Sequence, residues 1–299
     1  MDREARFNRA DRVSRVSLAA NVVLMTGKLG AGYFGGSAAV IADGVESAAD
    51  LLAVALSMAA VRIGRRPFDV RHPYGHGRAE HLAALIVSLL IVLFGAGILW
   101  DALRRLSSGD LPSPTMLAAG AAAATIVAKE CLYRYTDRAA RELGSPAVGA
   151  MAEDHRKDAV TSVATLIGVI GALAGFRWAD PAAALVTALL IFRIGYQMFT
   201  SAAYDIMDGT PGPELLAAMT AAAEEVSGVE HVHEIRARRS GQYFIVDLKL
   251  EMDPEMTVRE SHQVADAVKR RLFELFQEVG DVMIHINPHD QEHTDLIRL

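Results

Sequence analysis

Six long apolar stretches fill the first 207 residues of this 299-residue chain and limit its fold more than any other feature. A helix needs about 20 apolar residues to cross the hydrocarbon core of a bilayer. The stretches cover roughly residues 13–34, 37–63, 79–106, 114–135, 148–176 and 181–208. The sequence therefore predicts an all-α bundle of six transmembrane helices over residues 1–208. Because the N-terminus carries arginines and acids without a small-residue cleavage site, we expect the first helix to be retained.

Residues 209–299 have the patterns of a soluble domain. The segment Gly-Thr-Pro-Gly-Pro follows Asp208 and predicts the end of the sixth helix and a short linker. Helical patterns at 214–226 and 258–276 alternate with strand patterns at 233–238, 243–251 and 281–286. Gly241 between the first two strands indicates a hairpin. The order α-β-β-α-β predicts a small two-layer cytosolic domain over residues 209–299.

Arginine is concentrated on one side of the predicted bundle. Connections that face the cytoplasm are usually rich in Lys and Arg. The arginines of the richer side precede the first helix or lie in or beside the second and fourth connections: Arg3, Arg6, Arg9, Arg12, Arg15, Arg62, Arg65, Arg66, Arg71, Arg78, Arg134, Arg138 and Arg141. The opposite side has Arg104, Arg105 and Arg177. We therefore expect both termini in the cytoplasm of a cell with a bacterial-type inner membrane, or beside a membrane derived from it.

Composition and absent motifs exclude several function classes. The net charge of −6 argues against nucleic acid as a partner. A single cysteine, Cys131, excludes a disulfide framework within one chain and a Cys-rich zinc site. The chain has no Gly-x-x-x-x-Gly-Lys-Ser/Thr phosphate loop, so ATP-driven pumping is not expected. It also has no nucleophile elbow and no His-Glu-x-x-His motif.

Four carboxylates fall where the bilayer interior is predicted. Glu46 and Asp50 are four residues apart on the second helix, and Asp154 and Asp158 are four apart on the fifth. Residues at i and i+4 share one face of a helix. Acids inside a membrane span are expensive and usually face a cavity or a partner. Two facing pairs would make an oxygen cage whose mutual repulsion a divalent metal ion, or protons, would relieve.

Other roles for these positions stay open. The carboxylates could cap helices or pair with Lys28, Arg156 or Lys157 instead of binding metal. His155 lies three residues before Asp158 and could replace Asp154 as a ligand; the repeated four-residue spacing favours Asp154. Asp43 shares the Glu46 face, and we expect it to support the site or the structure.

The second connection carries Asp69, His72 and His76 within eight residues. One acid and two histidines at this spacing predict a metal site in a loop shaped by proline and glycine. The alternative is that the two histidines brace the helix ends.

Three segments together resemble the cation diffusion facilitator family, including its magnetosome-type and manganese or iron members. They read Gly-Gly-Ser-Ala-Ala-Val-Ile-Ala-Asp-Gly-Val-Glu-Ser-Ala-Ala-Asp at 35–50, His-Pro-Tyr-Gly-His-Gly-Arg-Ala-Glu at 72–80 and Asp-His-Arg-Lys-Asp-Ala-Val-Thr-Ser at 154–162. The resemblance extends over nearly the whole chain. It implies a homodimer with metallochaperone-like cytosolic domains, proton antiport and alternating access.

The resemblance also implies roles for individual residues. Glu46, Asp50, Asp154 and Asp158 take the four transport-site positions, and Asp69, His72 and His76 take the loop site. His233, His262 and His285 match cytosolic positions that bind regulatory metal, and Arg78 and Asp208 match an ion pair near the cytoplasmic face. The chain departs from the family pattern at Glu46, where Asp or His is usual. It departs from zinc-type members at the Asp154–Asp158 pair, and at Lys249 and Asn287 in the cytosolic site. Asp247 is the expected substitute ligand there.

Together these features predict a secondary transporter that exports a divalent transition metal, not an enzyme. Oxygen ligands favour Mn²⁺ or Fe²⁺, and Zn²⁺ stays open because of His155. The expected partners are a second copy of the chain, membrane lipid, protons and the metal, which is substrate and regulator; no cofactor is expected. The alternative is a membrane metal sensor or assembly scaffold with a non-transporting site. A metal-dependent hydrolase would need a separate water-activating base, and none is found.

Overall fold

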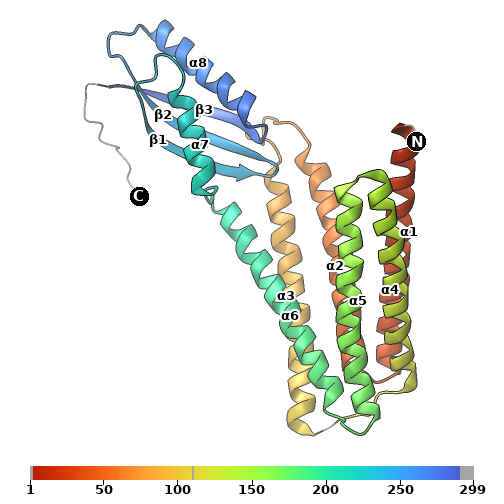
Figure 1. Cartoon of the computed structure of the whole chain (residues 1–299). Helices are drawn as coiled ribbons and strands as arrows, with labels where there is room; N and C mark the ends of the chain where they lie inside the picture. Colours follow the sequence, from red (N-terminus) through yellow and green to blue (C-terminus); the bar gives the residue numbers. More distant parts are fainter. Residues whose placement is uncertain (1–2, 110, 290–299) are drawn as a thin grey trace. The chain divides into compact units, whose positions relative to one another are not determined.

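The computed structural model describes residues 3–109 and 111–289 (Figure 1). Six long helices come first: α1 (Arg3–Phe34), α2 (Ala38–Gly64), α3 (Arg78–Ser108), α4 (Met116–Leu143), α5 (Pro146–Leu173) and α6 (Ala179–Ile206). A small α/β part follows, with α7 (Pro213–Glu224), β1 (His231–Ser240), β2 (Tyr243–Met252), α8 (Val258–Leu275) and β3 (Val279–Pro288). The predicted fold class, a six-helix part followed by an α-β-β-α-β domain, is confirmed.

By contacts, the described chain divides into two compact units. One holds the residues up to Leu56 together with Ile86–Phe199, and the other holds Ser57–Leu85 together with the residues from Thr200 onward. The second unit therefore includes the connection between α2 and α3 as well as the sheet. The predicted domain boundary at 208/209 stays a prediction.

Four of the six helices, α2, α3, α4 and α6, are long and apolar enough to cross a membrane. The first helix begins at Arg3, ten residues before its predicted start, and α4 continues to Leu143. The apolar stretch marks the part suited to lipid, but charged residues with good helix propensity extend the helix beyond it. Gly144 in the left-handed conformation (φ 59°) ends α4, and the Ser145 hydroxyl accepts the Val148 N–H to start α5.

Small side chains let the helices of the first unit approach closely, as is common in lipid. Ala39, Ala118, Ala122 and Ala184 are buried together in one cluster. The start of α2 is capped by Asp180 of α6, which accepts the Ser37 hydroxyl at 2.5 Å and the Ala38 N–H at 2.7 Å. A buried acid thus satisfies a buried helix N-terminus.

The sheet has the order β1-β2-β3, with β1 antiparallel and β3 parallel to β2. Alternate residues of β2, from Phe244 to Met252, are buried against Met219 of α7 and Leu272 of α8. The two helices therefore cover one face, and the intervening residues of β2 lie on the open face. Gly241 (φ 65°) forms the predicted hairpin turn, and a Thr257–Glu260 capping box begins α8.

Candidate metal sites

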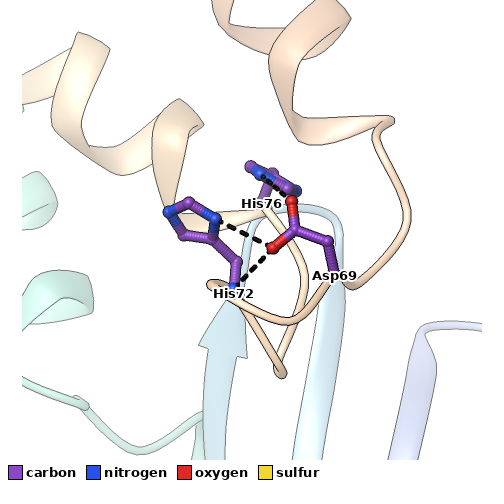
Figure 2. Close-up of side chains that lie close together, drawn as sticks. All are labelled: Asp69, His72 and His76. Atoms are coloured by element: carbon purple, nitrogen blue, oxygen red, sulfur yellow. Dashed lines mark hydrogen bonds and ion pairs between the residues drawn. The ribbon is translucent and has the colours of Figure 1, made fainter.

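The connection between α2 and α3 brings one acid and two imidazoles together (Figure 2). Asp69 Oδ1 accepts the backbone N–H groups of Arg71 (2.8 Å) and His72 (2.7 Å), and these bonds fold the loop tightly. His72 Nδ1 lies 3.3 Å from Asp69 Oδ1, and His76 Nε2 lies 3.6 Å from Asp69 Oδ2. One ligand atom from each residue lies within 4.8 Å of the others, which is close enough to hold a metal ion.

Local bonding prepares these side chains for a cation. His76 Nδ1 lies 3.2 Å from the Pro67 carbonyl oxygen, so it carries the proton and donates, leaving Nε2 as a free ligand. Hydrogen bonds from the loop, that of the His72 backbone first, lower the pKa of Asp69, which keeps the carboxylate ionised. Among the residues the structure describes, this is the one set of three or more such groups that converges.

The four membrane carboxylates lie between α2 and α5 without closing into a cage. Asp158 is within electrostatic range of Glu46 and Asp50, and Asp154 is within range of Asp50. Glu46 Oε2 is buried with no hydrogen-bond partner in the described chain. A buried carboxylate oxygen without a partner is uncommon in proteins, which distinguishes Glu46 from an ordinary structural acid. The predicted metal set therefore lies in one region of the first unit, but no three of its ligand atoms come within 4.8 Å of one another.

His155 and Asp154 differ in environment. The His155 side chain is 3% exposed, and neither ring nitrogen has a hydrogen-bond partner among the described residues. The Asp154 side chain is 73% exposed and lies 4.0 Å from Lys157. Of the two candidate ligands, His155 is the one that is buried and without a partner among the described residues.

Two buried lysines accompany these acids. Lys28 lies 2.9 Å from Asp43 Oδ1 and donates to the Ser47 hydroxyl, while Ser162 donates to Asp43 Oδ2 at 2.9 Å. Asp43 is therefore occupied by its own lysine and hydroxyl, in agreement with a supporting role.

Sequence reasoning missed the second lysine. Lys129 of α4 lies 2.5 Å from Asp158 Oδ2. The one signal in the sequence was a lysine inside an apolar stretch, and nothing in its spacing pointed to Asp158.

The cytosolic residues are distributed over the sheet and α8. Asp247 and His285 lie on the open face, on neighbouring strands but not directly opposite each other, since Lys249 faces His285. His262 lies on α8, 3.8 Å from Asp266, and so belongs to the layer on the opposite face. Within the described part of one chain, the ligand atoms of these residues do not gather.

His233 contacts a carboxylate of the neighbouring strand within one chain. Its Nδ1 lies 3.0 Å from Glu251 Oε1, and His289 Nδ1 lies 2.7 Å from Glu251 Oε2. Hydrogen bonds from His289 and then His233 lower the pKa of Glu251. Glu251 was not singled out in the sequence, because its role depends on the register of the sheet.

Arg78 and Asp208 are in contact in the second unit, and Arg238 Nη1 lies 3.5 Å from the other Asp208 oxygen. Beside them, His81 Nε2 accepts the Gly241 N–H at 2.9 Å, and His81 Nδ1 lies 3.3 Å from Asp205. These contacts join the start of α3 to the end of α6 and to the β1–β2 turn. All of them lie within one unit.

Membrane helices carrying buried carboxylates, followed by an open-faced α/β domain, define an integral membrane protein that handles cations. Residues 14–207 match the cation efflux transmembrane domain, and residues 211–289 match the cytoplasmic domain of cation efflux proteins. The chain belongs to the cation efflux family, also called the cation diffusion facilitators. Its cytoplasmic domain is of the family's dimerising type.

Several relatives align over most of their length. The chain is 35% identical to the manganese efflux system protein MneP of Bacillus subtilis, over 94% of this chain and 97% of that protein. It is 32% identical to the magnetosome protein MamB of Paramagnetospirillum magneticum (86% and 87% covered) and to metal tolerance protein 2 of Oryza sativa (93% and 78%). A solved structure of the MamM CTD, 28% identical, covers 25% of this chain and 96% of that one with a TM-score of 0.25.

Proposed function

We propose that this protein exports a divalent transition metal from the cytoplasm, with Glu46, Asp50, Asp158 and either Asp154 or His155 as cargo ligands. The observation that carries the proposal is the gathering of acids between α2 and α5 around a buried Glu46 oxygen, which has no hydrogen-bond partner among the residues that the structure describes. Acids in a membrane span are retained where they bind or move ions. Relatives named for manganese efflux and metal tolerance support the same function.

Manganese or iron is the favoured cargo. Carboxylate oxygens are hard ligands that suit Mn²⁺ and Fe²⁺ better than Cu⁺ or thiolate-preferring ions. Zn²⁺ becomes a better fit if His155 contributes nitrogen. The sequence similarity to a protein named for manganese efflux supports manganese.

Proton antiport follows from charge balance. When cargo leaves, several carboxylates remain close together in a medium of low dielectric constant, where unneutralised anions repel. Protons taken from the far side relieve this repulsion, and a new metal ion expels them. Alternating access of the site to the two sides of a bacterial-type inner membrane, with both termini cytoplasmic, completes the cycle.

Two further metal sites, one in the loop and one in the cytosolic domain, bind metal on the cytoplasmic side of the membrane. Asp69, His72 and His76 bind an ion at the loop, because their ligand atoms already converge. His233, Asp247, His262 and His285 bind regulatory metal only when two chains combine their ligands, since one chain does not bring them together. Binding there would favour a closed dimer.

The test is metal uptake into proteoliposomes that contain the purified full-length protein. Asp50→Asn and Asp158→Asn should each abolish Mn²⁺ uptake without preventing dimerisation, and Glu46→Asp should retain part of it. Asp101→Asn is the matched control, because Asp101 is an acid of α3 paired with Arg105 and placed outside the cluster. Normal flux in Asp50→Asn or Asp158→Asn would overturn the site assignment.

A metal sensor or scaffold is the second candidate. The contact of Lys129 with Asp158 favours it, since an internal cation on a ligand could mark a site that no longer transports. Absence of uptake of Mn²⁺, Fe²⁺ and Zn²⁺ by the wild-type protein would support this reading.

A further inference from the structure

The Lys129 ammonium sits at the meeting of three helices in the first unit. Its side chain is 3% exposed, and Nζ lies 2.5 Å from Asp158 Oδ2 on α5 and 2.8 Å from Asn21 Oδ1 on α1. Among the described residues, Asp158 is the one acid in contact with it. A buried ammonium in a membrane helix requires a counter-charge, so this contact is strongly held.

Asp158 therefore has two roles. In the proposed transport site it is a cargo ligand, and in the structure it is the counter-ion of a lysine. A divalent ion that binds the carboxylate must share it with the ammonium or displace it. Asn21 supplies a neutral acceptor at which a displaced ammonium keeps a hydrogen bond.

We propose that Lys129 is an internal counter-cation that competes with the cargo for Asp158 and thereby weakens cargo binding enough for release. This inference rests on the proposed transport site. When the site is empty, Lys129 offsets one carboxylate; when the metal arrives, the ammonium leaves Asp158 and keeps its hydrogen bond to Asn21. Lys129 does not touch the metal, so it is a positioning residue.

The other buried lysine does not share this role. Lys28 is matched by Asp43, which also accepts a hydrogen bond from Ser162 and is not a proposed ligand. The competition is therefore specific to Lys129, whose partner belongs to the metal set.

The kinetic test compares two variants of the full-length protein in proteoliposomes with Mn²⁺, or with Fe²⁺ or Zn²⁺ if the wild type transports one of those instead. Lys129→Gln removes the competing charge, and KM should fall by about tenfold because a unit charge a few ångströms away is lost at low dielectric constant. The kcat should fall as well, since release is slower. Asn21→Ala removes the alternative acceptor, so KM should rise by about two- to tenfold.

The opposite changes in KM expected for the two variants distinguish this role from a purely structural one. If Lys129 only tied α4 to α5 and α1, both variants would lower activity without lowering KM in either. Lys129→Met is a second variant in case Lys129→Gln does not fold, and it should lower KM in the same way. An unchanged or higher KM in the folded Lys129 variant overturns the proposal.

The transport-site assignment has its own readout. If Asp158→Asn abolishes uptake while Lys129→Gln leaves KM unchanged, the transport site stands and the competition is refuted. If Asp158→Asn transports normally, the assignment of Asp158 fails, and this inference fails with it.

Discussion

Gly77 lies against the β1–β2 turn so closely that a methyl group has no room. A Cβ at this position would be 2.6 Å from the Ser240 carbonyl oxygen, 2.8 Å from its carbon and 2.9 Å from its hydroxyl. Two of these atoms belong to the backbone, so rotating a side chain cannot relieve the contact. Overpacking of this kind costs typically about 1–3 kcal/mol. Gly77→Ala should therefore push the turn away from the start of α3.

The Gly241 amide reports this movement directly. Its N–H donates to His81 Nε2 at 2.9 Å, and the residue lies next to Ser240. A loss of about 1–3 kcal/mol in local stability corresponds to about 5- to 150-fold faster exchange of that hydrogen. Amides in the middle of β2, such as that of Leu248, should exchange at the wild-type rate, because the strain is local.

Hydrogen exchange measured by mass spectrometry on the detergent-solubilised protein gives the readout. Gly97→Ala is the control, since a Cβ there meets no atom within 4 Å, and it should leave the Gly241 exchange rate unchanged. If Gly77→Ala is folded and the exchange at Gly241 is as slow as in the wild type, then the close approach of this glycine does not hold the turn in place.

Three further predictions concern charge and metal preference. Asp154→His should shift competition uptake toward Zn²⁺ by replacing an oxygen ligand with nitrogen, and an unchanged preference would transfer the ligand role to the neighbouring histidine. Arg78→Ala should cost no more than about 1 kcal/mol in thermal unfolding, because the pair with Asp208 is half-exposed (51% and 43%) and Arg238 remains close by; removing both arginines should cost more than the sum of the single losses. Metal binding at the loop should be lost as pH falls through about 6.5, where histidine ordinarily gains a proton. The lowered pKa of Asp69 means that its carboxylate stays ionised over that range and protonates only below its ordinary value of 3.8, so calorimetry that located the loss near pH 4 would contradict the histidine assignment.

Local sequence patterns were sufficient to predict the features that depend only on residues close together in the chain. Apolar stretches predicted the six helices and alternation predicted the strands, because burial in lipid or against a core imposes its period on neighbouring residues. The helix ends were predicted less well, since hydropathy marks the part suited to lipid and charged residues extended α1 back to Arg3. The Asp69 loop needed no tertiary information, as its three side chains lie within eight residues.

Tertiary structure decided the partners of groups far apart in the sequence. Lys129 and Asp158 are 29 residues apart and on different helices, so only the packing of α4 on α5 reveals their contact. The burial of His155 beside an exposed Asp154 likewise depends on which face of α5 meets its neighbours. In the sheet, the register of β1 on β2 placed His233 beside Glu251. The sequence by itself determined which chemical groups this protein possesses and the helices and strands that carry them, whereas the packing of those elements determined which groups meet, because contacts between distant residues depend on geometry that no local pattern contains.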